Sequence, residues 1–485
     1  MHPTSLARAL ALGLITGGSA AHAVSLSPNG IGQALIYPYY TVQAGQQTLL
    51  SVVNTSDVGK AAKVRFLEGY NGREVLEFTV FLSPKDIWTA SVFKLSDAGL
   101  PGAGAAITTS DNTCTAPHLP EGPLPNGATY QHFLPYDYTG ANSDSGPTSD
   151  ARTNEGHFEV IAMADIVPGS ALDNDIRHVN GVPANCARAE TDFETGTGSV
   201  TPTSGLFGAA SLVDVAEGTF YAYDAQELDA FTAVKLNSPT GSGNPNLASA
   251  NDAGGATATA RQLVAGNLVN SVYPSARAID AVSALFAADV VYNEFLVESN
   301  GSVATDWVLT FPTKRFYVDT NDAQAQTAPF DHRFGAKEVG NGLGVSCTMV
   351  GVTLFDRNES TTAPPGCDFE CPPLPPPSSV CRETNVLEFG SGALGSQLGV
   401  AISQPFSAGM LQLALDTSDA PHVLGASSNG NQWHGLPAIG FAAIKYINGA
   451  VPLSGGGSAL ANYTAAYPHR PTVHCIGANA DGTCS

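Results

Sequence analysis

Two stretches of the chain alternate apolar and polar residues around an Asn-Gly dipeptide, and this pattern limits the fold more than any other feature. The first covers residues 63–82, with Asn-Gly at 71–72, and the second covers residues 293–311, with Asn-Gly at 300–301. A period of two predicts β-strands, and Asn-Gly tolerates the positive φ angles of a tight hairpin turn. We expect two β-hairpins in antiparallel sheets, each with one buried face.

The first hairpin stretch separates two kinds of side chain. Val64 and Phe66 alternate with Lys63 and Arg65, so one face of this strand is apolar and the other is charged. In a sheet with one buried face, the charged side chains would point towards solvent.

Other short segments have the same strand-like character, and polar turns separate them. A further hairpin is predicted at 206–223, turning near Glu217-Gly218, with a helical turn after it at 224–231. The best helix is predicted at 275–290, where Ser275 can cap it and one face carries Ile279, Val282, Leu285 and Phe286. The remaining strands are predicted at residues 31–42, 47–54, 86–93, 157–166, 345–357, 385–389, 410–415 and 439–447.

Composition agrees with a β-rich, loop-rich fold. Charged residues make up only 13% of the 485 residues, and 51 Gly and 32 Pro favour many turns. The second half repeats the order of strand motifs in the first. We therefore predict a mainly β fold of two antiparallel immunoglobulin-like β-sandwich domains, at 24–290 and 291–485, with long loops and a few short helices. The Pro-rich segment 372–379 would be an extended loop bracketed by cysteines.

The N-terminal residues have the features of an export signal. Arg8 precedes a short apolar run, and Ala21-His22-Ala23 is a small-x-small cleavage motif, so residues 1–23 are interpreted as a signal peptide. No later segment is apolar over the length that a transmembrane helix needs. We expect an exported protein of the cell surface, the extracellular space or the periplasm.

The cysteines support the same compartment. An even number of cysteines in an exported chain favours disulfides. Spacing suggests Cys114 with Cys186 and Cys475 with Cys484, and two bonds among the remaining four, whereas a zinc site lacks a second ligand pair at finger spacing. The eight disulfide candidates are Cys114, Cys186, Cys347, Cys367, Cys371, Cys381, Cys475 and Cys484.

The acidic balance of the chain limits its partners. The net charge of −22 repels phosphate backbones, so nucleic acid is excluded as a partner. Other envelope or extracellular proteins, or glycans, remain as partners. No cofactor is predicted, except that Ca²⁺ could bind in acidic loops, although a solvated loop is the simpler interpretation of those residues. The loop candidates are Asp137, Asp144 and Asp150, and Asp173 and Asp175 next to His178.

No catalytic motif stands out, and no catalytic residue is assigned. The sequence has no nucleophile elbow, no H-E-x-x-H motif and no P-loop, and it has no G-x-G-x-x-G motif on a strand–helix unit of the dinucleotide-binding kind. Glu155, His157 and Glu159 would share one strand face as an acid–base set, or as a half-exposed ladder. His469 and His474, beside Cys475, form a weak zinc candidate.

Aromatic side chains give a candidate surface for sugar stacking. In a sheet protein the same side chains also fit the core, which is the simpler interpretation. The six candidates are Tyr37, Tyr39, Tyr40, Trp88, Trp307 and Trp433.

Four stretches resemble a family of exported proteins of Gram-negative bacteria that are described as cell-surface proteins. They are EGHFEVIAMADI (155–166), ASLVDVAEGTFYAYDA (210–225), TDWVLTFPTKRFYVD (305–319) and GLPAIGFAAIKYING (435–449). The resemblance implies export and surface association but supplies no activity or catalytic residues.

Three functions therefore stay open. The first is a non-catalytic protein of the cell surface or envelope with a structural or interaction role. The second is an extracellular module that binds glycans or another ligand. The third is a secreted hydrolase whose site is assembled from distant loops.

Overall fold

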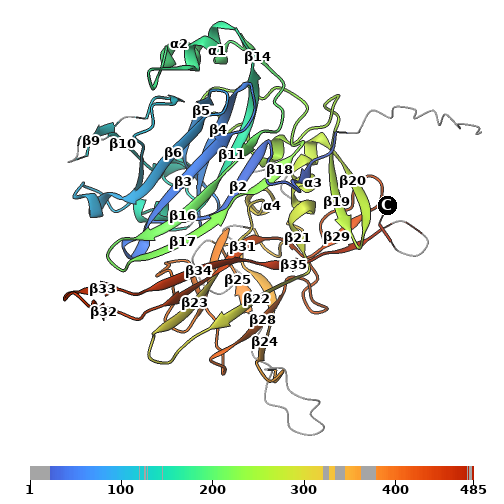
Figure 1. Ribbon diagram of the computed structural model, residues 1–485. Helices are drawn as coiled ribbons and strands as arrows, with labels where there is room; N and C mark the ends of the chain where they lie inside the picture. The colour runs from blue at the N-terminus through green and yellow to red at the C-terminus, as the bar shows by residue number, and fades with distance from the viewer. Residues whose placement is uncertain are drawn as a thin grey trace, which may run out of the picture.

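The protein is mainly β, with several antiparallel sheets and a few short helices (Figure 1). This confirms the predicted fold class at that level. The computed structural model describes residues 22–119, 121–124, 127, 129–144, 146–319, 327–333, 345–361, 378–477, 479 and 483–484. Residues 1–21 of the predicted signal peptide, most of the Pro-rich segment, and Cys367 and Cys371 lie outside the described residues.

The N-terminal half forms two large sheets. The first has the order β1-β18-β2-β11-β4-β5-β8, with β14 paired to β11. Its strands are β1 (Ser25–Leu26), β2 (Ala34–Thr41), β4 (Gly59–Glu68), β5 (Glu74–Leu82), β8 (Cys114–Ala116), β11 (Glu155–Ile166), β14 (Ser199–Val200) and β18 (Gln226–Asp229).

The second large sheet has the order β17-β16-β3-β6-β7-β10-β9, with β15 paired to β3. Its strands are β3 (Gln47–Asn54), β6 (Ile87–Lys94), β7 (Ala105–Thr108), β9 (Glu121–Pro123), β10 (Thr129–His132), β15 (Leu206–Phe207), β16 (Ala209–Asp214) and β17 (Thr219–Asp224).

These two sheets face each other across an aromatic core. Phe78 on β5 meets Trp88 on β6 with ring centroids 5.4 Å apart. On the first sheet, Phe158 stacks between Tyr37 and Phe66 at 4.0 and 4.8 Å. Alternate residues of β11 point into this core, which is why the sequence shows a period of two there.

The C-terminal half forms two five-stranded sheets, which lie below the first pair in Figure 1. Their orders are β25-β24-β28-β22-β35 and β27-β26-β23-β31-β34. All pairings are antiparallel except β26 with β27. The strands are β22 (Val290–Leu296), β23 (Val303–Thr310), β24 (Thr348–Asp356), β25 (Ser378–Val380), β26 (Thr384–Phe389), β27 (Gly399–Ala401), β28 (Ala408–Ala414), β31 (Ile439–Tyr446), β34 (Tyr463–Pro468) and β35 (Arg470–Thr472).

Smaller elements complete the fold. The helices are α1 (Ala171–Ile176), α2 (Cys186–Glu194), α3 (Ala278–Phe286) and α4 (Arg315–Val318), with short 3₁₀ turns between strands. The two-stranded pairs are β12 (His178–Val179) with β13 (Val182–Pro183), β19 (Thr257–Val264) with β20 (Asn267–Pro274), β21 (Ala287–Ala288) with β30 (Leu436–Pro437), β29 (Gln432–His434) with β36 (His474–Ile476), and β32 (Ala450–Pro452) with β33 (Ser458–Leu460).

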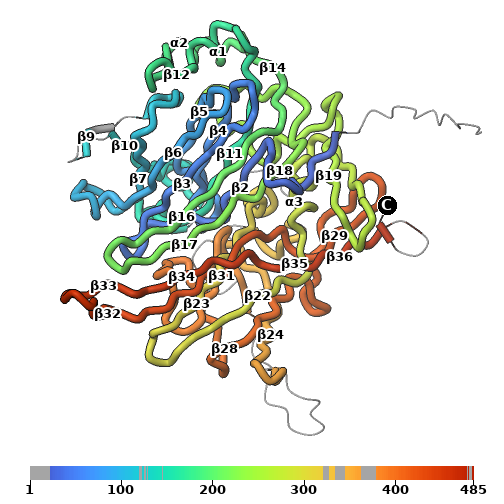
Figure 2. Tube along the Cα trace, viewed as in Figure 1, coloured from blue at the N-terminus to red at the C-terminus, as the bar shows by residue number. Residues whose placement is uncertain are grey.

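The two halves also meet along strands that are distant in the sequence. Figure 2 shows β17 beside β34, where the Phe220 backbone N–H donates to Thr464 Oγ1 at 3.2 Å. Backbone hydrogen bonds of 2.9 Å run from Thr384 N to Gly69 O and from Glu383 N to Tyr70 O. The start of β26 is therefore attached to the turn of the first hairpin.

The first predicted hairpin is confirmed, and the second is wrong. β4 pairs with β5 around Gly72, which has a φ of 66°. β22 and β23, however, belong to different sheets. Thr305 Oγ1 accepts from Leu296 N at 3.0 Å and donates to Leu296 O at 2.7 Å. A side chain thus satisfies the backbone groups that a hairpin ladder would use, and the strands diverge after the turn.

Other local predictions have mixed outcomes. The hairpin at 206–223 is confirmed by the pairing of β16 with β17. The helix at 275–290 exists but is shorter, since Ser275 begins a 3₁₀ turn and does not cap α3. The helical turn at 224–231 is wrong, because β18 takes those residues into the first sheet. Pairing with the exposed edge of β2 outweighs a weak local preference.

The charged face of the first hairpin is buried, contrary to the expectation of one solvent-facing side. Every residue of β2, β4 and β11 is buried. One face packs on the second sheet. The other is covered by α1, α2 and segments that follow residue 228. Lys63, on the covered outer face, is fully buried and lies 3.5 Å from Glu77. Lys60 alternates with it, on the side of Val64 and Phe66, and is also fully buried, 2.6 Å from Asp165.

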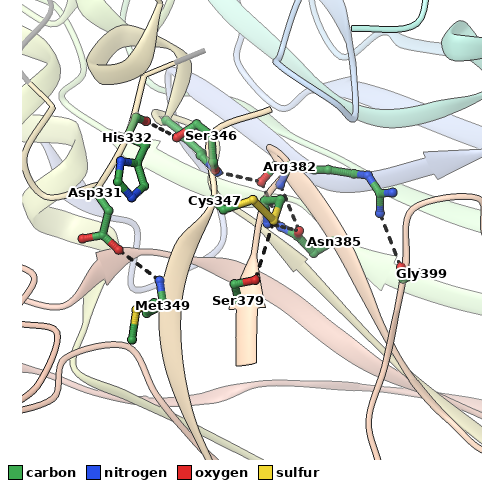
Figure 3. Close-up of a disulfide and its surroundings, with 11 residues drawn as sticks. Asp331, His332, Ser346, Cys347, Met349, Ser379, Arg382, Asn385 and Gly399 are labelled. Carbon is green, nitrogen blue, oxygen red and sulfur yellow. Dashed lines mark hydrogen bonds between the residues drawn. A yellow bond between two sulfur atoms is a disulfide. The ribbon is translucent and has the colours of Figure 1, made fainter. Parts of the chain in front are cut away.

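Three disulfides confirm the prediction of oxidised cysteines for six of the eight candidates. They are Cys114–Cys186, Cys347–Cys381 and Cys475–Cys484. The first ties α2 to the edge strand β8. The second joins the starts of β24 and β26 (Figure 3), where Asn385 Oδ1 accepts from Cys381 N at 3.2 Å. Among the described residues, no helix is long and apolar enough to cross a membrane.

The buried lysines provide a test of the fold. Replacing Lys60 with Ala leaves the buried Asp165 carboxylate without its cation, so we expect a loss of about 3–5 kcal/mol in the free energy of unfolding. The matched control is Lys85→Ala, which removes an exposed pair with Asp57 and should cost less than about 1 kcal/mol. Denaturant unfolding measures both values, and equal losses would contradict the burial of the Lys60–Asp165 pair.

Candidate functional site

A cluster of charged groups lies on the outer face of the first sheet, where segments of the C-terminal half cover it. Arg65 on β4 is the centre, with its guanidinium 2.7 Å from Glu74 on β5 and paired to Glu159 on β11. Arg65 is 1% exposed. The sheet register sets this contact, since Arg65 and Glu159 are direct partners across β4 and β11. Burial lowers the pKa of the Arg65 guanidinium, whereas the charges of Glu74 and Glu159 raise it. The two ion pairs outweigh burial, so the pKa of Arg65 is raised.

The predicted acid–base set of Glu155, His157 and Glu159 does share one face of β11, but it is not a half-exposed ladder. All three residues are buried. Burial raises the pKa of both glutamates. Glu155 accepts from the Tyr39 hydroxyl at 2.6 Å and from Gln397 N at 2.8 Å, so it links β2 to a C-terminal loop.

His157 is a neutral side chain in this cluster. Burial, followed by the charges of Arg315 and Arg65, lowers its pKa to about 3. Neither ring nitrogen has a hydrogen-bond partner among the described residues. His157 is fully buried and lines neither of the open depressions described below, so a substrate there would not reach it and the geometry does not support a catalytic role.

The sequence analysis missed the residues that cover this face. Lys314 Nζ donates to Ser346 O at 2.6 Å and to Arg382 O at 3.3 Å, and these two carbonyls flank the Cys347–Cys381 disulfide (Figure 3). Burial lowers the pKa of Lys314 to about 7 and raises the pKa of Glu383 to about 8. Two adjacent cations, Lys314-Arg315, in an otherwise apolar stretch were the available signal.

A second buried cluster attaches the long excursion after β6 to the first hairpin. Arg152 Nε donates to Glu68 Oε2 at 2.8 Å, and its Nη2 donates to Asp144 Oδ2 at 2.6 Å. Asn71 also donates to Asp144, at 2.9 Å. These hydrogen bonds lower the pKa of Asp144 to about 2 despite its burial. Asp144 is thus occupied by protein donors and is neither solvated nor arranged as a calcium loop.

The other acidic candidates are similarly occupied. Asp150 accepts from Ala103 N at 3.1 Å, and burial raises the pKa of Asp137. Asp173 accepts from Arg177 at 3.0 Å, and Asp175 pairs with Arg188. His178 lies apart from both, with its Nδ1 3.8 Å from Asp86. The structure does not bring these carboxylates together around one point.

The predicted histidine pair separates. His469 is buried, where its Nε2 lies 2.9 Å from Val308 O, and burial lowers its pKa to about 4. His474 is exposed, and its ring stands 4.6 Å from that of His434, centroid to centroid. The sequence did not indicate His434 as a neighbour of His474, because β29 and β36 are far apart in the chain.

The aromatic candidates for sugar stacking belong to the core. All six are less than 2% exposed, namely Tyr37, Tyr39, Tyr40, Trp88, Trp307 and Trp433. Sugar stacking through these side chains is therefore wrong, and the simpler core interpretation is confirmed.

Two shallow depressions open on the surface away from the buried charges. One, of about 530 Å³, lies on the second sheet over β3, β6, β7 and β16, and Ser51, Thr89, Ser91 and Thr108 contribute to its lining. The other, of about 600 Å³, lies over β22 and β28 and includes Tyr292, Glu294, Tyr446 and Arg470. Neither lining includes the buried acid–base set.

Comparison of the chain with protein-family models, with curated proteins and with solved structures gives no match. Function is therefore argued from the geometry. The buried clusters hold distant segments of the chain together, and the two depressions are open to solvent.

The burial of His157 predicts a pH effect. The pKa of His157 is near 6.5 in the unfolded chain and about 3 in the folded chain. Between these two pH values the unfolded state binds more protons than the folded state, so the folded state loses stability as the pH falls. His157→Phe removes this proton and no hydrogen bond, so we expect the free energy of unfolding to fall less between pH 7 and pH 5 than in the parent chain.

The same substitution at the exposed His118 is the control and should leave the pH slope unchanged. Urea unfolding at several pH values measures both slopes. An unaltered slope in His157→Phe would show that His157 takes up its proton equally well in the folded and unfolded chain.

Proposed function

We propose that this chain is an exported, non-catalytic protein of the cell surface or envelope that acts by contacting other extracellular proteins. In this proposal residues 1–23 are a signal peptide, and residues 24–290 and 291–485 form two immunoglobulin-like sandwich domains. The observation that carries the proposal is the uncharged depression on the outer face of the second sheet, together with the apolar side chains exposed on that sheet.

This face is defined by the first depression and the exposed apolar side chains around it. Its lining contains Ser, Thr, Ala, Leu and no charged residue, although the chain has a net charge of −22. Leu49, Ile87, Phe207 and Phe220 expose 41%, 48%, 39% and 55% of their surface. An open apolar face without charge is typical of a surface that binds another protein.

The edges of the sheets favour contact through this face over strand addition. Several edge strands have only two or three residues, among them β1, β8, β9, β25, β27 and β35. Short edges present few unpaired backbone groups to a partner. Three disulfides support an oxidising compartment, where such bonds persist.

The proposal predicts that charge on this face releases the protein from its partner. We expect Leu49→Lys with Ile87→Lys to move the chain from a high-molecular-weight surface fraction to the free monomer, because a lysine there would be desolvated on binding. Fractionation of the native host without reductant, followed by mass spectrometry, measures the shift.

Leu268→Lys is the matched control, since Leu268 is 59% exposed on β20, in a different sheet, and should leave the distribution unchanged. The proteins that co-purify with the parent chain name the partner. Recovery of the parent chain only as a free monomer contradicts the proposal.

A second candidate function is favoured by the other depression. Tyr292 and Tyr446 line it together with Glu294, Asp356, Arg357 and Arg470, and aromatic rings next to polar groups are suited to a sugar. If this surface binds a glycan, Tyr292→Ala should lower affinity at least about tenfold on a glycan array. Tyr463→Ala, at an exposed tyrosine outside the depression, is the control, and equal signals from both variants contradict glycan binding.

A further inference from the structure

We propose that Asp416, His434 and His474 form a binding site for a divalent transition-metal ion, with zinc as the best match. The proposal does not depend on the surface function above. These side chains come from three separate segments, and each can offer one ligand atom such that all three atoms lie within 4.8 Å of one another.

The two histidines are placed by a short antiparallel pairing. β29 and β36 align Gln432 with Ile476, Trp433 with Cys475, and His434 with His474. Direct partners across two strands project from the same face of the sheet. Both imidazoles therefore stand side by side, with centroids 4.6 Å apart.

The residue before His434 and the residue after His474 pack into the core on the opposite face of the two strands. Trp433 is fully buried, and its Nε1 donates to Ser271 Oγ at 3.0 Å. Cys475 packs against the same core and is bonded to Cys484. Since side chains alternate along a strand, anchoring Trp433 and Cys475 inward fixes His434 and His474 outward.

Asp416 is oriented before any metal arrives. Its Oδ1 accepts from the His422 backbone N–H at 2.8 Å, and its Oδ2 lies 3.0 Å from His434 Nδ1. The Asp416 backbone N–H in turn donates to Asp289 O at 3.2 Å. Hydrogen bonds of this kind, which orient a ligand from behind, are usual around metal sites.

The distances require only a small adjustment. Zinc binds imidazole nitrogen and carboxylate oxygen at about 2.0–2.2 Å, which puts the ligand atoms of a tetrahedral site about 3.3–3.5 Å apart. The Asp416–His434 pair is close to this spacing. His474 is exposed, so its ring is able to rotate the remaining ~1 Å inward.

The donor set selects the metal. Two imidazoles and one carboxylate suit zinc and related first-row ions, whereas calcium and magnesium prefer oxygen ligands. Three protein ligands leave one position for water or for a group from a partner molecule. The exposed position of His474 places that open coordination position at the surface.

The experiment is a zinc titration of the full, untagged, oxidised chain after removal of metals with a chelator. A polyhistidine tag is excluded because it binds the same ions. Isothermal calorimetry should give one equivalent of zinc, and His434→Ala, His474→Ala and Asp416→Asn should each weaken binding at least about tenfold. Zinc should also raise the melting temperature of the parent chain and not that of the variants.

His178→Ala is the matched control, since His178 also faces a carboxylate, Asp86, at 3.8 Å but belongs to no group of three possible metal ligands among the described residues. It should bind zinc as the parent chain does. Substituted Co²⁺ should give visible absorption in the parent chain and in His178→Ala but not in His474→Ala.

Two results overturn the proposal. One is no binding by the parent chain at a stoichiometry of one. The other is equal weakening by His178→Ala and His474→Ala, which would show adventitious binding to surface histidines. Because His474 is exposed, its alanine variant should retain the parent far-ultraviolet circular dichroism, which separates lost ligation from lost folding.

Discussion

The burial of charged side chains between the two halves is the constraint on which the rest of the structure depends. Arg65 and Glu159 lie on strands of the first sheet, yet they are only 1% and 2% exposed. Removing an ion from water costs several kcal/mol, and only close pairing and hydrogen bonds recover that cost. The strands β4, β5 and β11 must therefore hold one register, because a slip of one residue would move each charge to the apolar face.

This requirement also explains how the C-terminal half is attached. Arg315 Nη1 donates to Gly72 O at 2.9 Å, and the hydrogen bonds of Glu383 and Thr384 to the same turn fix the start of β26. The Cys347–Cys381 bond lies immediately behind, with Lys314 donating to the carbonyls beside it. A disulfide at this point restrains the segment that covers the charges, which is where loss of order would expose them.

Sequence patterns predicted the strands well and their surroundings poorly. A period of two and Asn-Gly were sufficient to place β4, β5 and the turn between them. The same period cannot tell a charged face in water from a charged face under another part of the chain, since both alternate identically. The second Asn-Gly gave a wrong prediction for a related reason. It predicts a turn, but it does not determine whether the turn closes a hairpin or connects two sheets. Here the side chain of Thr305 and the distant pairing partners of β22 and β23 determine that the turn connects two sheets.

The site predictions failed where they depended on neighbours in sequence. His469 and His474 are close in the chain, but the first points into the core and the second outward. Glu155, His157 and Glu159 do share a face, and that face is closed. By contrast, His434 and His474 meet because β29 pairs with β36, a contact that no local pattern encodes. In a fold built from long-range antiparallel pairs, side chains converge across strands. Candidate ligand-binding side chains are therefore to be sought at cross-strand positions on exposed faces. The buried charges of this protein hold strands and segments together.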